Sequence, residues 1–177
     1  GLLGGGSRFL GVTEDCGGYL HGVLEEHEDL PTDDAGWDAL ALAAVRRTKD
    51  AGQFVPGLGH PVHKVQDPRT PRLIQIADEE GLRGPHLRLF EAIGRVHEEV
   101  LGRRLPLNGA GVCGAALADL GLPVELLRGF ALLARAAGLL GQIAEERRSP
   151  IGMDAYLPID RNAHYVDPHV DPTEDQD

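Results

Sequence analysis

Prolines and glycines divide this chain into segments in which apolar residues recur at helical spacing. That spacing predicts helices over residues 13–27, 37–49, 70–81, 85–100, 112–120 and 123–147. Thr13 and Thr70 are predicted to cap the first and third of these helices, and Pro85 to open the fourth. Because no alternating apolar pattern extends beyond a few residues, the sequence predicts an all-α fold of several antiparallel helices. In the last helix, the predicted packed face consists of Leu126, Leu127, Phe130, Leu133, Ala134 and Ala137.

Charge and composition limit the classes of partner that the chain is expected to bind. Its 177 residues carry a net charge of −11, with acidic residues crowded at 25–34 and 167–177. A basic stripe is absent, which argues against nucleic-acid binding. No apolar run reaches the ~18 to 20 residues of a membrane span, so no membrane partner is expected. Cys16 and Cys113 predict neither a disulfide framework nor a paired-cysteine metal site, and they fit a reduced, cytoplasmic setting.

The residues best suited to chemistry lie in the stretch 55–64, VPGLGHPVHK, which is followed by Asp67-Pro68-Arg69. Two glycines let the backbone approach a ligand closely. The imidazole of His60 titrates near neutrality and can donate a hydrogen bond to a developing oxyanion. Arg69 offers a two-point grip on a carboxylate, and Lys64 a point charge suited to phosphate. We therefore predict a loop that holds an anionic small molecule and polarises one of its oxygens.

A second arginine, Arg135, lies within the most apolar predicted helix. Burying a guanidinium without an anionic partner is costly, so Arg135 either faces outward or binds a carboxylate. The remaining histidines are expected to be structural or solvated, and no metal site is predicted. They are His63 on the loop, His21, His27, His86 and His97 at surface or boundary positions of helices, and His164 and His169 in an acidic tail.

Residues 55–60, VPGLGH, together with Asp67-Pro68-Arg69, resemble the signature of the citrate synthase superfamily. Residues 133–138, LARAAG, with Gln142-Ile143 resemble that family's second arginine-bearing helix, and residues 108–123 resemble the segment between them. The resemblance spans about residues 1–157. It implies a citrate synthase-like helical fold, a small domain plus part of a large one, in an enzyme that works as a homodimer on coenzyme A thioesters and a keto or hydroxy acid with two or three carboxylates.

By position, the resemblance also implies roles for single residues. His60 matches the catalytic histidine that hydrogen-bonds the oxaloacetate carbonyl, and Arg69 and Arg135 match the arginines that bind its carboxylates. The coenzyme A positions are Pro56, Gly57, Leu58 and Gly59 against the adenine and Lys64 near the phosphates. Coenzyme A enters as a thioester substrate, and no metal is implied.

The same resemblance predicts the domain order. Residues 1–12 end a large-domain helix, 13–121 form a small helical domain that carries the loop, and 122–157 form a C-terminal large-domain helix. Residues 158–177 are predicted as an acidic, disordered tail. We expect the N-terminal part of such an enzyme to precede this chain.

Two departures from the family pattern bear on the reaction. Residues 6–11, GSRFLG, place Phe9 or Leu10 where citrate synthases carry a histidine in a Leu-His-Gly turn. This Arg-Phe pattern resembles the citryl-CoA lyase branch, including the lyase module of ATP-citrate lyase. The family's acid/base aspartate follows an asparagine by two positions, where this chain has Ala110. No nearby carboxylate replaces it, because Asp119 is more than two helical turns further on.

Three functions are therefore open. The leading hypothesis is a citryl-CoA lyase-like enzyme that cleaves citryl-CoA, or a related 3-hydroxy-3-carboxyacyl-CoA, to acetyl-CoA and oxaloacetate. A citrate or methylcitrate synthase would use the same site in the condensing direction. A non-catalytic coenzyme A-binding paralogue would account for Ala110.

Overall fold

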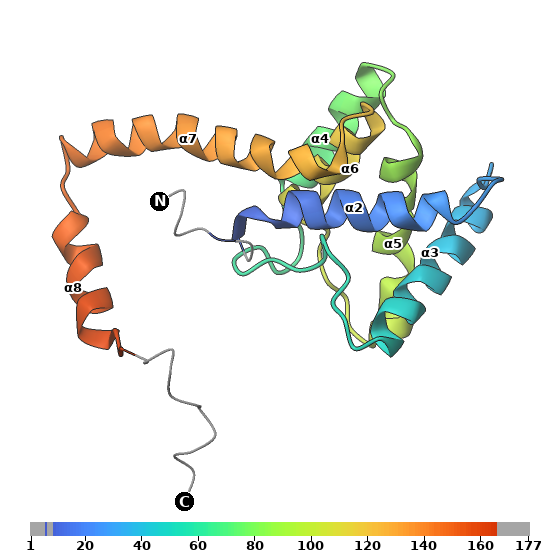
Figure 1. Cartoon of the computed structure of the whole chain (residues 1–177), viewed down its shortest axis with the longest axis horizontal. Helices are drawn as coiled ribbons and strands as arrows, with labels where there is room; N and C mark the ends of the chain where they lie inside the picture. The colour runs from blue at the N-terminus through green and yellow to red at the C-terminus, as the bar shows by residue number, and fades with distance from the viewer. Residues whose placement is uncertain (1–5, 7–8, 166–177) are drawn as a thin grey trace, which may run out of the picture. The chain divides into compact units, whose positions relative to one another are not determined.

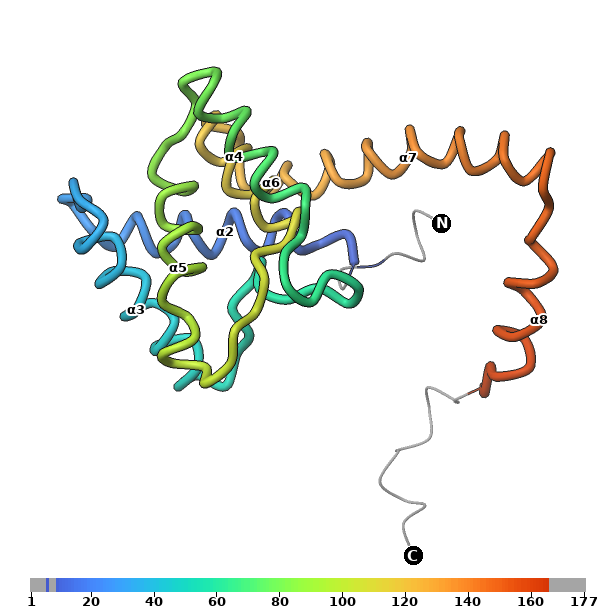
Figure 2. The backbone as a smooth tube through the Cα atoms, turned by 180° about the vertical axis from the view of Figure 1, so that it is seen from behind, coloured from blue at the N-terminus to red at the C-terminus, as the bar shows by residue number. Residues whose placement is uncertain are grey.

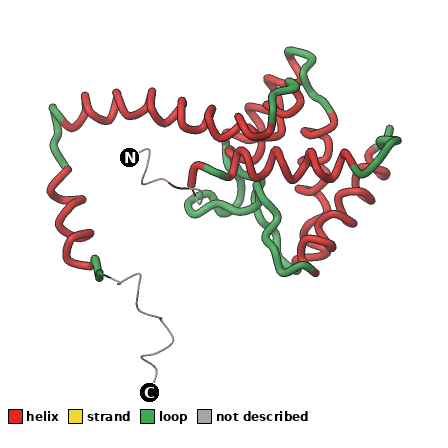
Figure 3. The backbone as a smooth tube through the Cα atoms, in the orientation of Figure 1, coloured by secondary structure: helices red, strands yellow, loops and turns green. Residues whose placement is uncertain are grey.

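Helices dominate the described part of the chain, which comprises Gly6 and residues 9–165 of a computed structural model (Figure 1). In chain order they are α2 (Val12–Glu25), α3 (Asp34–Asp50), α4 (Arg69–Glu79), α5 (Pro85–Leu101), α6 (Gly109–Asp119), the 3₁₀ turn η1 (Val124–Leu126), α7 (Leu127–Glu146) and α8 (Gly152–Asn162). The described residues form no strand, and their one isolated β-bridge joins Leu58 to Leu107 (Figure 3). The prediction of an all-α fold is confirmed.

The chain divides into two compact units, Gly1–Ala136 and Ala137–Asp177. In the first unit α3 packs along α5, and α2 packs along α6 while also contacting α5 (Figure 2). These four helices supply the fully buried apolar side chains Leu20, Val45, Leu87, Leu89, Phe90, Ile93 and Val112. Burying one side chain of this size is worth roughly 1.5–3 kcal/mol, so this shared core is the main support of the unit.

Glycines let α2 and α6 approach each other closely. A Cβ at Gly114 would lie 2.2 Å from the carbonyl oxygen of Thr13, and a Cβ at Gly17 would lie 2.3 Å from Cδ1 of Leu127. Neither position has room for a side chain. Leu127 itself is fully buried, so the contact with Gly17 also anchors the start of α7 on α2.

The helix starts agree with the sequence only in part. α5 begins at Pro85 as predicted. α6 begins at Gly109 rather than at residue 112, because Asn108 Oδ1 accepts a hydrogen bond from the Gly111 N–H at 2.8 Å. The prediction that Thr13 and Thr70 are caps is wrong, since both are buried within their helices. Thr70 Oγ1 donates instead to the Leu107 carbonyl at 3.0 Å.

α7 does not bury the face that the sequence predicts for it. Leu127 is the one buried residue of this helix, and the other five members of the predicted face are exposed. The packed-face prediction is therefore correct for Leu127 alone. Periodicity identified an apolar face, but no described element covers it.

The segment Val124–Glu146 is also long and apolar enough to cross a membrane by length and composition, with a mean hydropathy of 1.3. This differs from the expectation that no segment meets that criterion. Arg128 and Arg135 interrupt its apolar residues. One such helix is weak support for a membrane segment, because length and hydropathy alone do not tell a span from an amphipathic helix.

The second unit contains a helix that the sequence does not predict. α8 begins at Gly152. The carboxylate of Glu146, at the end of α7, accepts the backbone N–H groups of Ile151 and Gly152, each at 2.9 Å. These two bonds lower the pKa of Glu146. Residues 158–162, predicted as part of a disordered tail, are helical. Residues 166–177, including His169, lie outside the described residues, and the predicted domain limits stay predictions.

Candidate active site

The loop between α3 and α4 is held against the start of α6. The Gly59 N–H donates to the Pro106 carbonyl at 2.8 Å, and the Asn108 N–H donates to the Gly57 carbonyl at 2.9 Å. The side chain of Asn108 adds a third bond, from Nδ2 to the Gly59 carbonyl at 2.9 Å. Gly57 and Gly59 have φ values of +85° and +82°, which favour glycine. Two glycines and one asparagine therefore fix the shape of the loop.

Gly57 also lets the loop rest directly on the core. A Cβ at this position would lie 2.6 Å from the Phe90 ring and 2.9 Å from Cys16 Sγ. Both neighbours are fully buried. The predicted ligand loop is thus tied to the core of the first unit by close packing as well as by hydrogen bonds.

A buried carboxylate organises the end of this loop. The side chain of Asp67 is fully buried and accepts four hydrogen bonds. Oδ1 accepts from the Arg69 backbone N–H at 3.1 Å and from Arg69 Nε at 2.9 Å. Oδ2 accepts from Arg69 Nη2 and from the Gly109 N–H, both at 2.7 Å. Chiefly through the Arg69 bond, and against the effect of burial, the pKa of Asp67 is held well below its usual range.

Arg69 brings its guanidinium to His60, with 3.3 Å between Arg69 Nη2 and His60 Nε2. On the other side of the imidazole, His60 Nδ1 accepts the backbone N–H groups of Val62 and His63 at 3.1 and 3.0 Å. A neutral histidine that accepts at Nδ1 carries its proton at Nε2. The Nε2–H and the guanidinium are then two neighbouring donors, and an oxygen-rich anion would satisfy both.

The neighbours of His60 favour this neutral form. Its pKa is lowered, first by partial removal from water and then by the positive charge that His63 can carry. The rings of His60 and His63 lie 4.6 Å apart. Lys64 Nζ turns back to the His60 carbonyl at 3.3 Å, so its side chain lies along the loop.

A cavity of about 410 Å³ is lined in part by residues of the loop. Its lining residues are Lys49, Gln53, Phe54, Val55, Leu58, Gly59, Leu101, Arg103 and Leu105. Two are cationic, and the Phe54 ring is 88% exposed. The cavity therefore offers positive charge, an aromatic face and the backbone of the loop to one ligand.

The sequence and the fold of this chain both match known proteins. A family model described as "Citrate synthase, C-terminal domain" matches residues 17–152. This chain belongs to the citrate synthase family. A citrate synthase of Deinococcus radiodurans is 28% identical over 158 residues, which are 85% of this chain and 41% of that protein. The structure of citryl-CoA lyase from Hydrogenobacter thermophilus matches with a TM-score of 0.72 at 26% identity, covering 97% of this chain and 62% of that one. The chain thus spans less than two thirds of the length of either relative.

Of the three residues that citrate synthase resemblance singles out for the keto diacid, the structure brings together His60 and Arg69. Arg135 is exposed on α7. It makes no hydrogen bond or ion pair with the residues that the structure describes, and so none with the loop. The sequence left open whether Arg135 faces outward or binds a carboxylate, and its exposure agrees with the first alternative.

The two departures from the citrate synthase pattern lie in different surroundings. Ala110 is partly exposed and follows Gly109, whose N–H binds Asp67. Asp119 does not serve this site, since its buried carboxylate accepts three backbone N–H groups at the start of α5 and also binds His86. Phe9 is 68% exposed. Arg8, the other half of the Arg-Phe pattern, lies outside the described residues.

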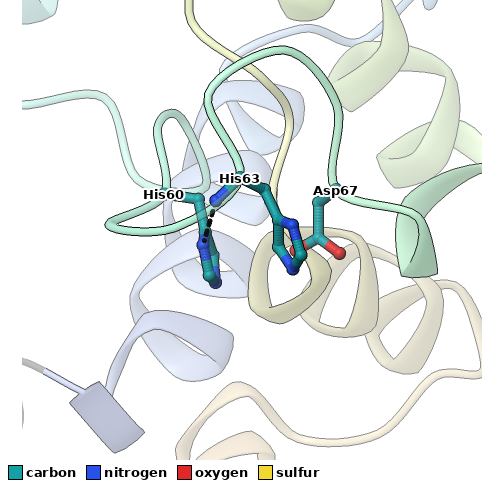
Figure 4. Close-up of side chains that lie close together, drawn as sticks. All are labelled: His60, His63 and Asp67. Carbon is teal, nitrogen blue, oxygen red and sulfur yellow. Dashed lines mark hydrogen bonds between the residues drawn. The ribbon is translucent and has the colours of Figure 1, made fainter.

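His60, His63 and Asp67 also form a cluster that meets the distance criterion for a metal site, with one possible ligand atom of each within 4.8 Å of the others (Figure 4). The donor set does not suit a cation. Both oxygens of Asp67 already accept two hydrogen bonds each, and His60 Nδ1 accepts two more. The positive guanidinium of Arg69 lies 3.3 Å from the remaining nitrogen of His60. These bonds make the cluster part of the hydrogen-bond network around Arg69.

Sequence reasoning missed the supporting residues of the site. Asp67 entered only as part of a motif, yet it holds Arg69 in place. Asn108 served only to locate the position of Ala110, although an asparagine before a helix is a recognised cap. His97, expected at a surface or boundary position, is buried, and its Nε2 accepts the Leu105 N–H at 2.9 Å. That bond positions Leu105, which lines the cavity beside the loop.

Proposed function

We propose that this chain carries the substrate-binding part of a citryl-CoA lyase-like enzyme, which cleaves citryl-CoA, or a related 3-hydroxy-3-carboxyacyl-CoA, to acetyl-CoA and oxaloacetate. The observation that carries the proposal is the pair of donors 3.3 Å apart, His60 Nε2 and Arg69 Nη2. The likeness to the Hydrogenobacter thermophilus citryl-CoA lyase supports it.

The reaction needs charge stabilised on one oxygen. As the carbon–carbon bond of citryl-CoA breaks, the tertiary hydroxyl loses its proton and becomes the carbonyl of oxaloacetate, while the thioester enolate gains a proton at carbon. His60 donates Nε2–H to that oxygen and Arg69 binds the adjacent carboxylate. The proton that leaves the hydroxyl is carried by water to the enolate carbon, so that no proton is gained or lost overall. Donors of this kind, placed before the reaction, are typically worth about 10²- to 10³-fold in rate each.

Coenzyme A would lie along the other side of the loop. The backbone of Pro56, Gly57, Leu58 and Gly59 would contact the adenine, as the family resemblance implies. The neighbouring cavity adds Lys49 and Arg103 for the phosphates and the exposed ring of Phe54 for stacking. Lys64 stays a candidate phosphate contact.

Arg135, the homodimer and the cytoplasmic setting belong to the same proposal. Arg135 would bind the second carboxylate of oxaloacetate in the assembled dimer, which suits an arginine that has no ion pair in the described chain. Cys16 and Cys113 are both free thiols, in keeping with a reducing compartment.

A binding experiment tests whether the donor pair of His60 and Arg69 binds oxaloacetate. Oxaloacetate is titrated into the chain by calorimetry, and into Arg69→Ala. A charge-assisted bond contributes about 1.5–3 kcal/mol, so the variant should bind roughly ten- to a hundredfold more weakly. Arg72→Ala is the matched control, because Arg72 lies one turn further along α4 with its side chain also 58% exposed. Absence of oxaloacetate binding by the folded chain, or equal losses in the two variants, would contradict the proposal.

Ala110 favours a second candidate, a non-catalytic coenzyme A-binding protein. A positioned acid is worth about 10²- to 10⁴-fold, so its loss leaves binding intact and turnover slow or absent. Acetyl-CoA release from citryl-CoA is measured on the natural polypeptide that carries this chain. Measurable release excludes the binder, whereas turnover that appears only in Ala110→Asp supports it. Release of free thiol from acetyl-CoA and oxaloacetate would favour the synthase direction.

A further inference from the structure

A chain of four ionisable side chains links three helices away from the loop. His21 and Glu25 lie on α2, His86 lies at the start of α5, and Asp119 ends α6. His21 Nδ1 and His86 Nε2 are 3.4 Å apart. The other nitrogen of each ring faces a carboxylate: His86 Nδ1 lies 2.8 Å from Asp119 Oδ1, and His21 Nε2 lies 3.2 Å from Glu25 Oε1.

The carboxylates decide which nitrogens carry protons. Asp119 receives three backbone N–H groups as well as His86, so it acts as an acceptor and His86 must donate from Nδ1. Glu25 is the acceptor beside His21 Nε2, although its side chain is 69% exposed, and it favours the tautomer of a neutral His21 with the proton on Nε2. In neutral imidazoles the two remaining nitrogens, His86 Nε2 and His21 Nδ1, are then both lone pairs. Two lone pairs that face each other at 3.4 Å need a positive partner between or beside them.

The distances and charges suit a metal dication. Two nitrogens bound to one tetrahedral zinc at about 2.0–2.1 Å lie about 3.3–3.4 Å apart. Histidine ligands usually donate their second nitrogen to a carboxylate, which is the arrangement of both rings here. Asp119 and Glu25 supply two negative charges, and the side chain of His21 is 47% exposed, which leaves a path for a cation and room for water ligands.

We propose that His21 and His86 form a two-histidine site for a divalent transition-metal ion of the zinc type, oriented by Glu25 and Asp119. Imidazole nitrogen suits zinc, nickel and copper better than magnesium or calcium. The ion would join α2 to the start of α5, outside the proposed active site.

The test is a titration of the chain with ZnCl₂ by calorimetry at pH 7.5, in the background His164→Ala/His169→Ala to remove the histidines near the C-terminal end. We expect one zinc per chain, at least tenfold weaker binding in His21→Ala, and about tenfold weaker binding in Glu25→Ala because the orienting carboxylate is lost. His27→Ala, two residues beyond the end of α2, is the matched control and should bind like the parent.

Three results would overturn the site. The first is a flat isotherm, which would mean that the two rings share a proton instead. The second is zinc binding that is unchanged in His21→Ala. The third is zinc binding that is lost in His63→Ala, which would place the ion at the loop. Folding is checked by circular dichroism. Imidazole ¹⁵N shifts of the unsubstituted chain give a second readout, because zinc should move the signals of His21 and His86 and leave those of His97 in place.

Discussion

Asp67→Asn is the sharpest test of how the loop is held. The carboxylate accepts two hydrogen bonds at each oxygen, one of each pair from a backbone N–H. An asparagine replaces one oxygen with an NH₂ group, so in either orientation two donors lose their acceptor, one of them a backbone N–H. Each lost bond costs roughly 1–3 kcal/mol, and the guanidinium of Arg69 can partly rehydrate because its side chain is 58% exposed. We therefore expect Asp67→Asn to lower the free energy of unfolding by about 2–4 kcal/mol.

The pH dependence gives the prediction a second part. Because the folded-state pKa of Asp67 is depressed, its contribution to stability is complete above the ordinary aspartate pKa of about 3.9 and is lost as pH falls through the folded-state value. The difference between the parent and Asp67→Asn should therefore be largest near pH 7 and should shrink below about pH 4.

Urea unfolding followed by circular dichroism at several pH values measures both parts. Asp29→Asn is the control, since Asp29 is exposed in a loop and should change stability by less than about 0.5 kcal/mol. A loss equal to that of the control at pH 7, or a difference that persists undiminished at pH 3, would refute the account of Asp67 as the ionised anchor of Arg69.

Three further substitutions test the packing. Gly109→Ala should destabilise the fold by about 1–3 kcal/mol and weaken oxaloacetate binding, because its Cβ would lie 2.6 Å from Arg69 Nε; Gly22→Ala in α2 meets nothing within 4 Å and should stabilise by about 0.5–1 kcal/mol in the same urea assay. His97→Phe should lower stability by about 1–3 kcal/mol by leaving the part-buried Leu105 N–H without its acceptor, which thermal unfolding would show as a lower Tm, and an unchanged Tm would contradict that role. Leu127→Ala should cost about 2–5 kcal/mol as a cavity mutation, whereas equal stability would show that α7 is not anchored there.

The helices and the candidate site residues were predicted from the sequence on different physical grounds. Helices over 37–49 and 85–100 follow from periodicity, and α3 and α5 lie there. The pairing of His60 with Arg69 followed from residue chemistry and a resemblance, and the structure brings these two side chains together. Periodicity and composition both act locally, which is why they were sufficient for these features.

The features that were missed depend on contacts between distant segments. Asp67 receives a hydrogen bond from Gly109, 42 positions along the chain, and no local pattern shows such a pair. Asp119 was dismissed as too far from the loop, and it is indeed used elsewhere, at the start of α5. His97 looked like a boundary residue because its partners are backbone groups, which have no sequence signature. Long-range polar contacts of this kind decide the detailed geometry of the site.

Under the proposed function, substrate binding and turnover depend on different parts of one local structure. Arg69 is held by Asp67, and Asp67 is held in turn by Gly109, the first residue of α6. The donor pair is thereby tied to a buried carboxylate, although Arg69 itself is 58% exposed, and the contacts that hold it do not involve the side chain of Ala110. Ala110, at the position where the resemblance implies an acid/base aspartate, follows Gly109 in the chain and has no polar side chain. The proposed function therefore predicts that affinity for a keto diacid falls when Arg69 is replaced and does not fall when Ala110 is replaced.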